Sequence, residues 1–415
     1  MGRVGLICLP GLEAAVTAGR DELQWVEIEP QVSWRPDRGV DSVLRSGPVT
    51  VARELGLPIL VHSVSAPVGG TVAPPRAQVD LLAALVAELE CPWISEHLSI
   101  LRIPDGGDPA FTGVLLAPPQ TDAAVDVAAA NIGYLRCGVG VPVAFETGVN
   151  YLKPRAGELS DGSYFRAVAE AADCGILLDL HNLWCNEQNG RQPAREVIGE
   201  LALERVWEIH VAAGYRRDGY YLDAHSGPTD QPVLDLLAAV VPTLPNLRAV
   251  VFEVSPDRVG PGMLTHDDIV EHLGALASIV GEPGFSPDRA ARSGLDDVQR
   301  WEQSLGGLTL GHPVTGELAE SLSADPGHRV WRDIALASRR GQLAGLLPLT
   351  VRLLLDSVGE AAVLERLGEI WACTPPAETS AAEIHALAPL LRAAWSSTVP
   401  LLDDVLEVEL RATSV

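Results

Sequence analysis

Short apolar runs recur along the first 280 residues, and a stretch with helical spacing of apolar positions follows most of them. Alternating strand and helix patterns of this kind are typical of a parallel sheet covered by helices. The runs that predict strands are 4–10, 25–30, 57–64, 92–99, 142–148, 175–182, 206–213 and 249–256, and the clearest amphipathic stretches are 78–90, 121–136, 164–173 and 233–244. Eight such units predict a (β/α)8 TIM barrel, because that fold usually takes ~250 residues or somewhat more. An open, doubly wound sheet is the alternative, but no G-x-G-x-x-G motif follows the first run.

The pattern changes after residue 280. Residues 281–297, "GEPGFSPDRAARSGLDD", are rich in glycine, proline and charged residues, which is typical of a linker. From residue 298 to residue 415 the apolar spacing is helical throughout. We therefore expect an α/β fold made of a TIM-barrel domain over 1–280, a linker over 281–297 and a smaller all-helical domain over 298–415.

Charge and composition narrow the classes of function. With 30 basic against 55 acidic residues, the formal net charge is −25, which is the opposite of the basic surface that nucleic-acid binding requires. No signal-peptide pattern opens the chain, and no apolar stretch is long enough to span a bilayer. The six cysteines are scattered without a C-x-x-C pair. We therefore expect reduced thiols and a cytoplasmic protein with no nucleic-acid or membrane partner.

Acidic and histidine side chains stand at the carboxyl ends of the predicted strands, which is the edge where a TIM barrel builds its active site. In chain order they are Glu27, Glu29, His62, Glu96, His97, Glu146, Asp179, His210 and Glu253, with His181 and Asn182 in the loop after the sixth strand and Asp223 and His225 in the loop after the seventh. Taken singly, such a histidine is more often structural, and a strand-terminal acid often caps the next helix. Taken together, so many carboxylates would repel one another unless cations lay between them. We therefore predict a multinuclear metal site, and its mixture of ligands suits iron, manganese or zinc.

Seven short motifs around these residues resemble one family in their order and spacing. They are LVHS, ISEHLS, FETGVNYL, LLDLHNLWCNEQNG, EIHVAAG, DAHSGP and FEVSP, and they lie within about residues 3–260. The family they resemble is that of the multinuclear non-heme iron-dependent oxidases, TIM-barrel enzymes that modify ribosomally made peptides. The resemblance implies two or three iron ions in a mixed Fe(II)/Fe(III) state, with O2 as co-substrate. It implies as metal ligands His62, His97, Glu146, Asp179, His210, Asp223, His225 and Glu253.

The same resemblance assigns three further residues to the catalytic site. The family usually shows Asp-x-Asn-Asn after the sixth strand, so Asn182 matches the pattern and His181 departs from it. His181 is therefore open to three interpretations: an added ligand, a partner of a ligand or a substrate contact. Glu29 matches an acidic position that commonly follows the second strand, where contact with substrate is the better interpretation.

The activity that the resemblance implies is O2-dependent oxidation of a side chain in a ribosomally made precursor peptide. Cysteine is the side chain we expect, because a thiolate is a good ligand for ferrous iron. The helical region 298–415 has its own resemblance, to the helical partner proteins that present the precursor peptide to these oxidases. It would then supply the function of that partner within one chain. A helical oligomerisation or capping domain is the alternative.

Two other classes of barrel enzyme use similar residues. Zinc-dependent phosphodiesterases of the apurinic-endonuclease type have nearly the same set and favour a histidine just after the sixth-strand aspartate, as at His181. The net charge of −25 argues against them because it would repel DNA. Sugar isomerases of the same superfamily need a catalytic lysine near the metals, and Lys153, after the fifth strand, is the chain's only lysine.

Overall fold

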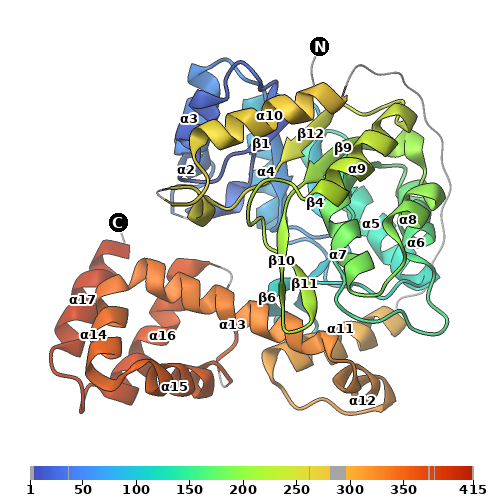
Figure 1. The fold of residues 1–415 in the computed structure, drawn as a ribbon. Helices are drawn as coiled ribbons and strands as arrows, with labels where there is room; N and C mark the ends of the chain where they lie inside the picture. Colours follow the sequence, from blue (N-terminus) through green and yellow to red (C-terminus); the bar gives the residue numbers. More distant parts are fainter. Residues whose placement is uncertain are drawn as a thin grey trace. The chain divides into compact units, whose positions relative to one another are not determined.

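Eight parallel strands close into a barrel in the computed structural model, which describes residues 4–35, 37–260, 262–280, 296–372, 374–377 and 379–413. Around the barrel the strands follow the order β1-β12-β9-β8-β7-β4-β3-β2. Each barrel strand is therefore hydrogen-bonded to the barrel strands that come before and after it in the sequence, and the last strand, β12, closes the ring on β1. The predicted TIM barrel is confirmed (Figure 1). The barrel strands are β1 (Val4–Ile7), β2 (Trp25–Ile28), β3 (Ile59–Ser63), β4 (Ile94–His97), β7 (Val143–Glu146), β8 (Gly175–Asp179), β9 (Val206–Val211) and β12 (Ala249–Phe252).

Helices cover the outside of the barrel, because each has one apolar face that packs against the strands. The long ones agree with the predicted amphipathic stretches to within a few residues at each end. The helices in this part of the chain are α1 (Glu13–Ala18), α2 (Asp41–Leu44), α3 (Gly47–Glu54), α4 (Arg76–Leu89), α5 (Asp122–Val139), α6 (Asp161–Ala172), α7 (Leu180–Gln188), α8 (Ala194–Glu200), α9 (Gln231–Val240) and α10 (His266–Val280).

The sixth predicted strand is shorter than its apolar run indicated. The prediction ran to residue 182, but β8 ends at Asp179 and helix α7 begins at once. The Asp179 carboxylate caps this helix by accepting a hydrogen bond from the backbone N–H of Asn182 at 2.8 Å. His181 and Asn182 therefore lie in the first turn of a helix, and the expectation that they lie in a loop was wrong.

Two antiparallel hairpins interrupt the β/α alternation, and the apolar pattern did not predict either. The first is formed by β5 (Ile100–Ile103) and β6 (Ala110–Leu116), between β4 and α5. The second is formed by β10 (Gly214–Arg217) and β11 (Tyr220–Asp223), and it follows β9. Its two-residue turn, Asp218-Gly219, has positive φ at both positions, as hairpin turns of this length require. Asp223 is the last residue of β11, so this hairpin delivers it to the rim.

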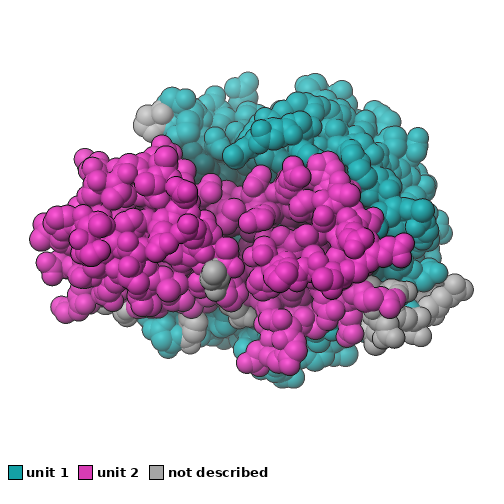
Figure 2. Space-filling model, turned by 90° about the horizontal axis from the view of Figure 1, so that it is seen from below, with its two compact units in different colours: residues 1–100, 117–298 teal, residues 101–116, 299–415 magenta. Residues whose placement is uncertain are grey.

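Contacts divide the chain into two compact units (Figure 2). One holds residues 1–100 and 117–298, and the other holds residues 101–116 and 299–415. The hairpin of β5 and β6 is thus grouped with the helices of the second unit, which the domain boundaries expected from the sequence did not include. Of the linker expected over 281–297, residues 281–295 lie outside the described residues, and the remaining two already belong to helix α11.

The second unit is helical apart from its hairpin. Its apolar core gathers Leu343, Leu354, Leu387 and Trp395 with other buried residues of the later helices. Among the described residues of either unit, no helix is both long and apolar enough to cross a membrane. The helices are α11 (Asp296–Leu310), α12 (Glu317–Ala324), α13 (Gly327–Leu346), α14 (Pro348–Val358), α15 (Glu360–Ala372), α16 (Ser380–Trp395) and α17 (Leu402–Thr413).

Candidate metal centre

The candidate ligands lie at the carboxyl end of the barrel, each at or just after the end of an element. Strands place most of them because successive side chains alternate between the two faces, so one residue per strand end points into the barrel mouth. By element, the residues are His62 in β3, His97 in β4, Glu146 in β7, Asp179 in β8, His210 in β9, Asp223 in β11, His225 two residues beyond it, and Glu253 directly after β12.

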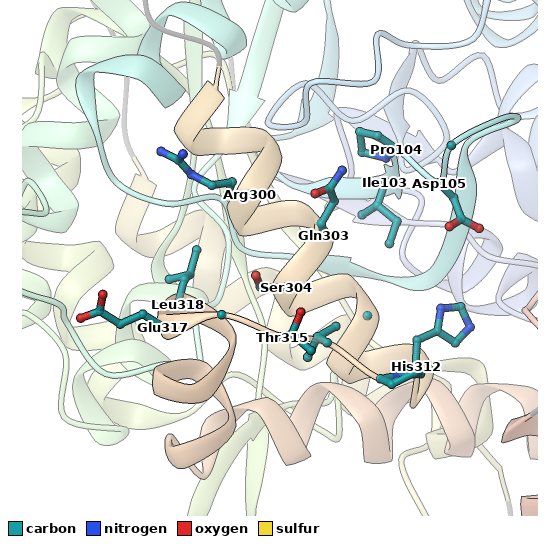
Figure 3. A pocket seen from close by; sticks show the side chains of 15 residues that line it. Ile103, Pro104, Asp105, Arg300, Gln303, Ser304, His312, Thr315, Glu317 and Leu318 are labelled. Atoms are coloured by element: carbon teal, nitrogen blue, oxygen red, sulfur yellow. The ribbon is translucent and has the colours of Figure 1, made fainter.

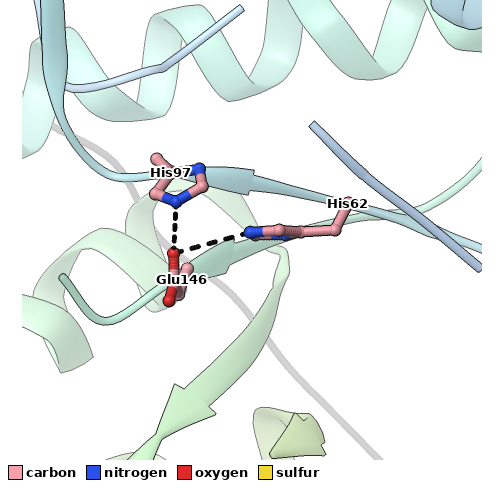
Figure 4. Close-up of side chains that lie close together, drawn as sticks. All are labelled: His62, His97 and Glu146. Carbon is pink, nitrogen blue, oxygen red and sulfur yellow. Dashed lines mark ion pairs between the residues drawn. The ribbon is translucent and has the colours of Figure 1, made fainter. Parts of the chain in front are cut away.

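The first cluster is formed by His62, His97 and Glu146, whose donor atoms lie within 4.8 Å of one another (Figure 4). Nε2 of His97 is 2.8 Å from Oε2 of Glu146, and Nε2 of His62 is 3.8 Å from the same oxygen. The two imidazole rings are tilted against each other, with their centroids 4.6 Å apart. Two imidazoles thus converge on one buried carboxylate oxygen.

Neighbouring groups fix which nitrogen of each histidine faces this point. Nδ1 of His97 lies 3.0 Å from the backbone carbonyl of Ser63, which can only accept a hydrogen bond. Nδ1 of His62 lies 2.9 Å from the hydroxyl of Ser95. When Nδ1 carries the proton in this way, the neutral ring has its lone pair on Nε2, where a cation between Nε2 and Glu146 could be bound. Histidine ligands of metals are commonly oriented by such outer hydrogen bonds. Burial and the neighbouring His97 also hold the pKa of His62 well below its usual range, which favours the neutral ring that a metal needs.

The second cluster shares Glu146 with the first and adds Asp179 and His210, again with donor atoms within 4.8 Å of one another. The side-chain amide of Asn182 donates to Oε1 of Glu146 at 3.2 Å. Burial, followed by the charge of Glu146, raises the pKa of Asp179 well above its usual range. A carboxylate common to two clusters is the arrangement expected of a bridging ligand between two cations.

The third group lies on the more open side of the rim. Nε2 of His225 is 3.0 Å from Oδ1 of Asp223 and 3.4 Å from Oε2 of Glu253. The side chains of His97, Asp223 and His225 are 15%, 23% and 28% exposed, whereas those of the other candidate ligands are 4% exposed or less. These three residues therefore mark the side from which a substrate can approach.

His181 is completely buried beside this third group. Its Nε2 lies 3.5 Å from Oδ1 of Asp223 and 3.4 Å from Sγ of Cys185, one helical turn further along α7. Gly214 leaves room for the ring, because a Cβ at that position would come within 3.1 Å of Cε1 of His181. His181 contacts a candidate ligand and a thiol, and burial lowers its pKa.

Glu29 follows β2 and is half-buried, with its Oε2 accepting a hydrogen bond from the side chain of Gln31 at 3.3 Å. Burial, followed by the charge of Glu253, raises the pKa of Glu29 to about 7. Its charge also interacts with His97 and His225, so it faces the open side of the rim. A carboxyl group with this pKa can give or take a proton near neutral pH.

Two acidic residues near the centre were not predicted as ligands or catalytic residues: Glu27 was noted only as a strand-end acid, and Glu208 was not noted at all. Glu27 and Glu208 are fully buried, and their carboxyl oxygens lie within 4.8 Å of a His210 nitrogen. Each stands two residues before a rim residue on its own strand, so it points the same way but deeper in the barrel. The indole N–H of Trp93 donates to Oε2 of Glu208 at 2.9 Å. The i, i+2 spacing of Glu27 from Glu29, and of Glu208 from His210, was the signal that could have identified them.

The arrangement of the donor atoms suits coordination of metal ions better than it suits hydrogen bonds among the side chains. Oδ2 of Asp179 is buried without a hydrogen-bond partner among the described residues. Oε2 of Glu146, Oδ1 of Asp223 and both nitrogens of His210 are buried too, and they face ion-pairing groups 2.8–3.3 Å away without forming hydrogen bonds of good geometry. Buried polar atoms without partners are costly and rare in folded proteins. Nitrogen and carboxylate oxygen atoms 2.8–3.5 Å apart match the spacing of adjacent ligands around one ion with bonds of about 2.0–2.2 Å. The geometry therefore supports a metal centre of more than one ion.

Comparison with known proteins gives a family match over most of the barrel. Residues 3–258 match the family described as "RiPP precursor modification enzyme MbnB/TglH/ChrH". A "UPF0276 protein" of Streptomyces avermitilis is 29% identical over 270 residues, which are 63% of this chain and 52% of that protein. Another, from Chromobacterium violaceum, is 29% identical over 210 residues, which are 50% of this chain and 71% of that protein. The match to the Streptomyces relative thus spans only about half of that protein's length.

Solved structures with similar barrels are more distant. The 3-keto-D-glucoside 4-epimerase YcjR from E. coli is 15% identical, with a TM-score of 0.41, and the match covers 67% of this chain and all of that one. A D-psicose 3-epimerase is 12% identical, with a TM-score of 0.44, and the match covers 68% of this chain and all of that one. At this level of similarity, nothing about the activity of the present chain follows from theirs.

Proposed function

The chain belongs to the MbnB/TglH/ChrH family of RiPP precursor modification enzymes, and we propose that it is an O2-dependent, multinuclear iron oxidase that modifies a cysteine side chain of a ribosomally made precursor peptide. The observation that carries the proposal is the pair of clusters joined by Glu146, with buried oxygen and nitrogen atoms directed between them. Hydrogen bonds among these side chains, without metal ions, would not satisfy all of these buried atoms.

The residues that would hold the ions fall into three groups around the rim. The first group is His62, His97 and Glu146. The second is Asp179, His210 and the same Glu146. The third is Asp223, His225 and Glu253. Imidazole and carboxylate are ligands that suit non-heme iron, and the carboxylates would stabilise its ferric state. Bound iron would supply the binding of O2 and of a substrate thiolate and the oxidising power for the reaction.

The chain's own residues would orient the ions and the substrate. Asn182 fixes Glu146 by donating to Oε1, and we assign His181 a positioning role because it is buried against Asp223 and does not face the open side. Glu29 is the residue assigned to the substrate, since it lies at the open side of the rim with a pKa of about 7. There it can accept the proton that a cysteine thiol releases when it binds as a thiolate.

The helical unit would bind the precursor peptide. It contains a pocket of about 740 Å³ between the end of β5, helix α11 and the segment 312–318 (Figure 3). Gln303, Ser304, His312 and Thr315 are among the polar side chains that line it, together with apolar Ile103 and Leu318. A pocket with both polar and apolar walls, formed entirely within one unit, suits a short peptide segment. The proposal places the enzyme in the cytoplasm, where ribosomal peptides are made.

One observation favours a second candidate, a zinc-dependent phosphodiesterase. Nε2 of His181 lies 3.5 Å from Oδ1 of Asp223, so His181 is positioned to serve as a further ligand of the third group. The family match and the net charge of −25 support the oxidase instead.

The deciding experiment is metal analysis of protein purified without oxygen, followed by co-expression with a cysteine-containing precursor peptide. We expect more than one iron per chain and an oxidative mass change in the peptide. His97→Ala and Asp223→Ala should lower the iron content of folded protein, whereas His266→Ala, at the start of helix α10, should not. Zinc alone, together with phosphodiesterase activity, would show that the oxidase assignment is wrong.

A further inference from the structure

His210 differs from the other rim histidines because one of its nitrogens faces a carboxylate at the rim and the other faces a carboxylate deeper in the barrel. Nδ1 lies 3.3 Å from Oε1 of Glu253, and Nε2 lies 2.8 Å from Oε2 of Glu27. Glu253 is a candidate ligand at the rim, whereas Glu27 lies inside the barrel. The ring therefore spans two levels of the barrel interior, with one nitrogen at each.

The lower level is closed by apolar side chains. Glu208 lies beside Leu177 in the strand register, whereas His210 lies beside Asp179. Ile7 and Leu60 lie beside Glu27 in the strand register, and both belong to a buried apolar cluster that also includes Trp93. Glu27 and Glu208 are fully buried, so bulk water does not reach them. In this environment the carboxylate of Glu27 has two polar neighbours, the ring of His210 and the carboxyl group of Glu208.

A neutral imidazole ligand carries one N–H and one lone pair, so only one nitrogen can bind an ion. Because Nδ1 faces the rim and Nε2 faces Glu27, we infer that Glu27 is a positioning residue that accepts the Nε2–H of His210 and thereby makes Nδ1 the metal-binding nitrogen. This arrangement is the reverse of that at His62 and His97, where Nδ1 is tied to the protein and Nε2 faces the centre. The inference rests on the metal centre of the proposed function, but not on iron, on O2 or on a peptide substrate.

Glu208 has a supporting part. Its Oε2 is held by the indole of Trp93, a contact that joins β9 to the start of β4 across the barrel. Its other neighbours are Glu27 and His210, whose donor atoms lie within 4.8 Å of its own. Outer residues of this kind set both the tautomer and the orientation of a ligand, and replacing them typically weakens metal binding by about 10–100-fold.

Cadmium-113 and nitrogen-15 NMR tests the inference directly. The full chain would be labelled with nitrogen-15 histidine, stripped of metal and reloaded with cadmium-113. The signals of His210 would be identified by their absence from the spectrum of the His210→Gln variant. We expect scalar coupling between cadmium and Nδ1 of His210, together with a bonded proton on Nε2. Coupling to Nε2 would overturn the inference, and would instead place an ion among Glu27, Glu208 and His210. Coupling to neither nitrogen of His210, while His62 and His97 still couple to cadmium, would overturn the inference and leave the metal centre standing. No coupling at any of these three histidines would refute the metal centre itself, and the inference with it.

Variants of Glu27 add a second measurement. Glu27→Leu should weaken cadmium binding by about 10–100-fold and abolish the slowly exchanging Nε2 proton. Glu27→Gln retains an acceptor oxygen, so it should restore most of the affinity and the proton signal. Glu383→Gln is the matched control, because it alters a buried carboxylate that pairs with Arg339 in the other unit. Full affinity and an unchanged proton signal in Glu27→Leu would contradict the inference.

Discussion

Replacing Asp179 with asparagine should stabilise the metal-free protein and weaken its metal binding. Asp179 is 1% exposed, and its donor atom lies within 4.8 Å of those of Glu146 and His210. Without a cation, two carboxylates at this distance repel each other, and burial adds a desolvation cost. Asparagine has nearly the same shape and is also a good N-cap, so the hydrogen bond from the backbone N–H of Asn182 is retained.

The expected size follows from the separation of the charges. The donor atoms of Asp179 and Glu146 lie no more than 4.8 Å apart, and at that limit two unit charges repel by about 3 kcal/mol at an effective dielectric constant of ~20. The neighbouring His210 offsets part of this when it is protonated, so we expect a net gain of about 1–2 kcal/mol in the free energy of unfolding. The pKa of Asp179 is higher in the folded chain than in the unfolded chain, so the folded state holds the extra proton and loses stability as the pH rises. The gain should therefore be larger at pH ~8 and should shrink as the pH falls towards ~4.

The assay is urea unfolding of chelator-treated protein at high and low pH, repeated after metal is added. Asp161→Asn is the matched control, because Asp161 is a buried aspartate that forms an ion pair with Arg191. There the same substitution should lower stability, since it leaves the buried Arg191 without its charged partner. Added metal should stabilise the wild type and have little effect on Asp179→Asn. Equal destabilisation by both substitutions in metal-free protein would refute the argument that the rim carboxylates repel one another.

Three further outcomes follow from other contacts. Ser95→Ala removes the hydroxyl that lies 2.9 Å from Nδ1 of His62, so metal affinity should fall by about 10-fold, as a competition titration with a chromophoric chelator would reveal. Arg339→Leu leaves Glu383 buried without the guanidinium 2.7 Å away, and should lower the free energy of unfolding of the helical unit by about 3 kcal/mol. Burial lowers the pKa of His272 to about 4, so the unfolded chain binds the extra proton between pH ~4 and ~6.5 and the protein loses stability as the pH falls through that range. His272→Gln should flatten this dependence by about 3 kcal/mol in denaturation curves measured across the range, and an unchanged slope would contradict the assignment.

Local patterns explain why so much of the barrel could be predicted. The strands that end at Glu146 and at His210 were visible as apolar runs broken by a charged residue, because hydrophobic spacing is a property of neighbouring positions. The hairpin that carries Asp223 was missed, although Asp218-Gly219 is a turn signal that the sequence displays. The end of β8 was also misjudged, because an apolar run does not show where Asp179 begins to cap a helix.

The sequence by itself determined the eight-strand ring and the identity of the side chains at its carboxyl edge. It did not determine which oxygen meets which nitrogen, because those distances depend on strand register and on closure of the barrel. Glu27 is 183 positions away from His210 along the chain, yet register brings their side chains to 2.8 Å. The grouping of the hairpin at 101–116 with the C-terminal helices is likewise a matter of long-range contacts. Only the tertiary structure, through packing between segments distant in sequence, decided how the ligands are shared and oriented.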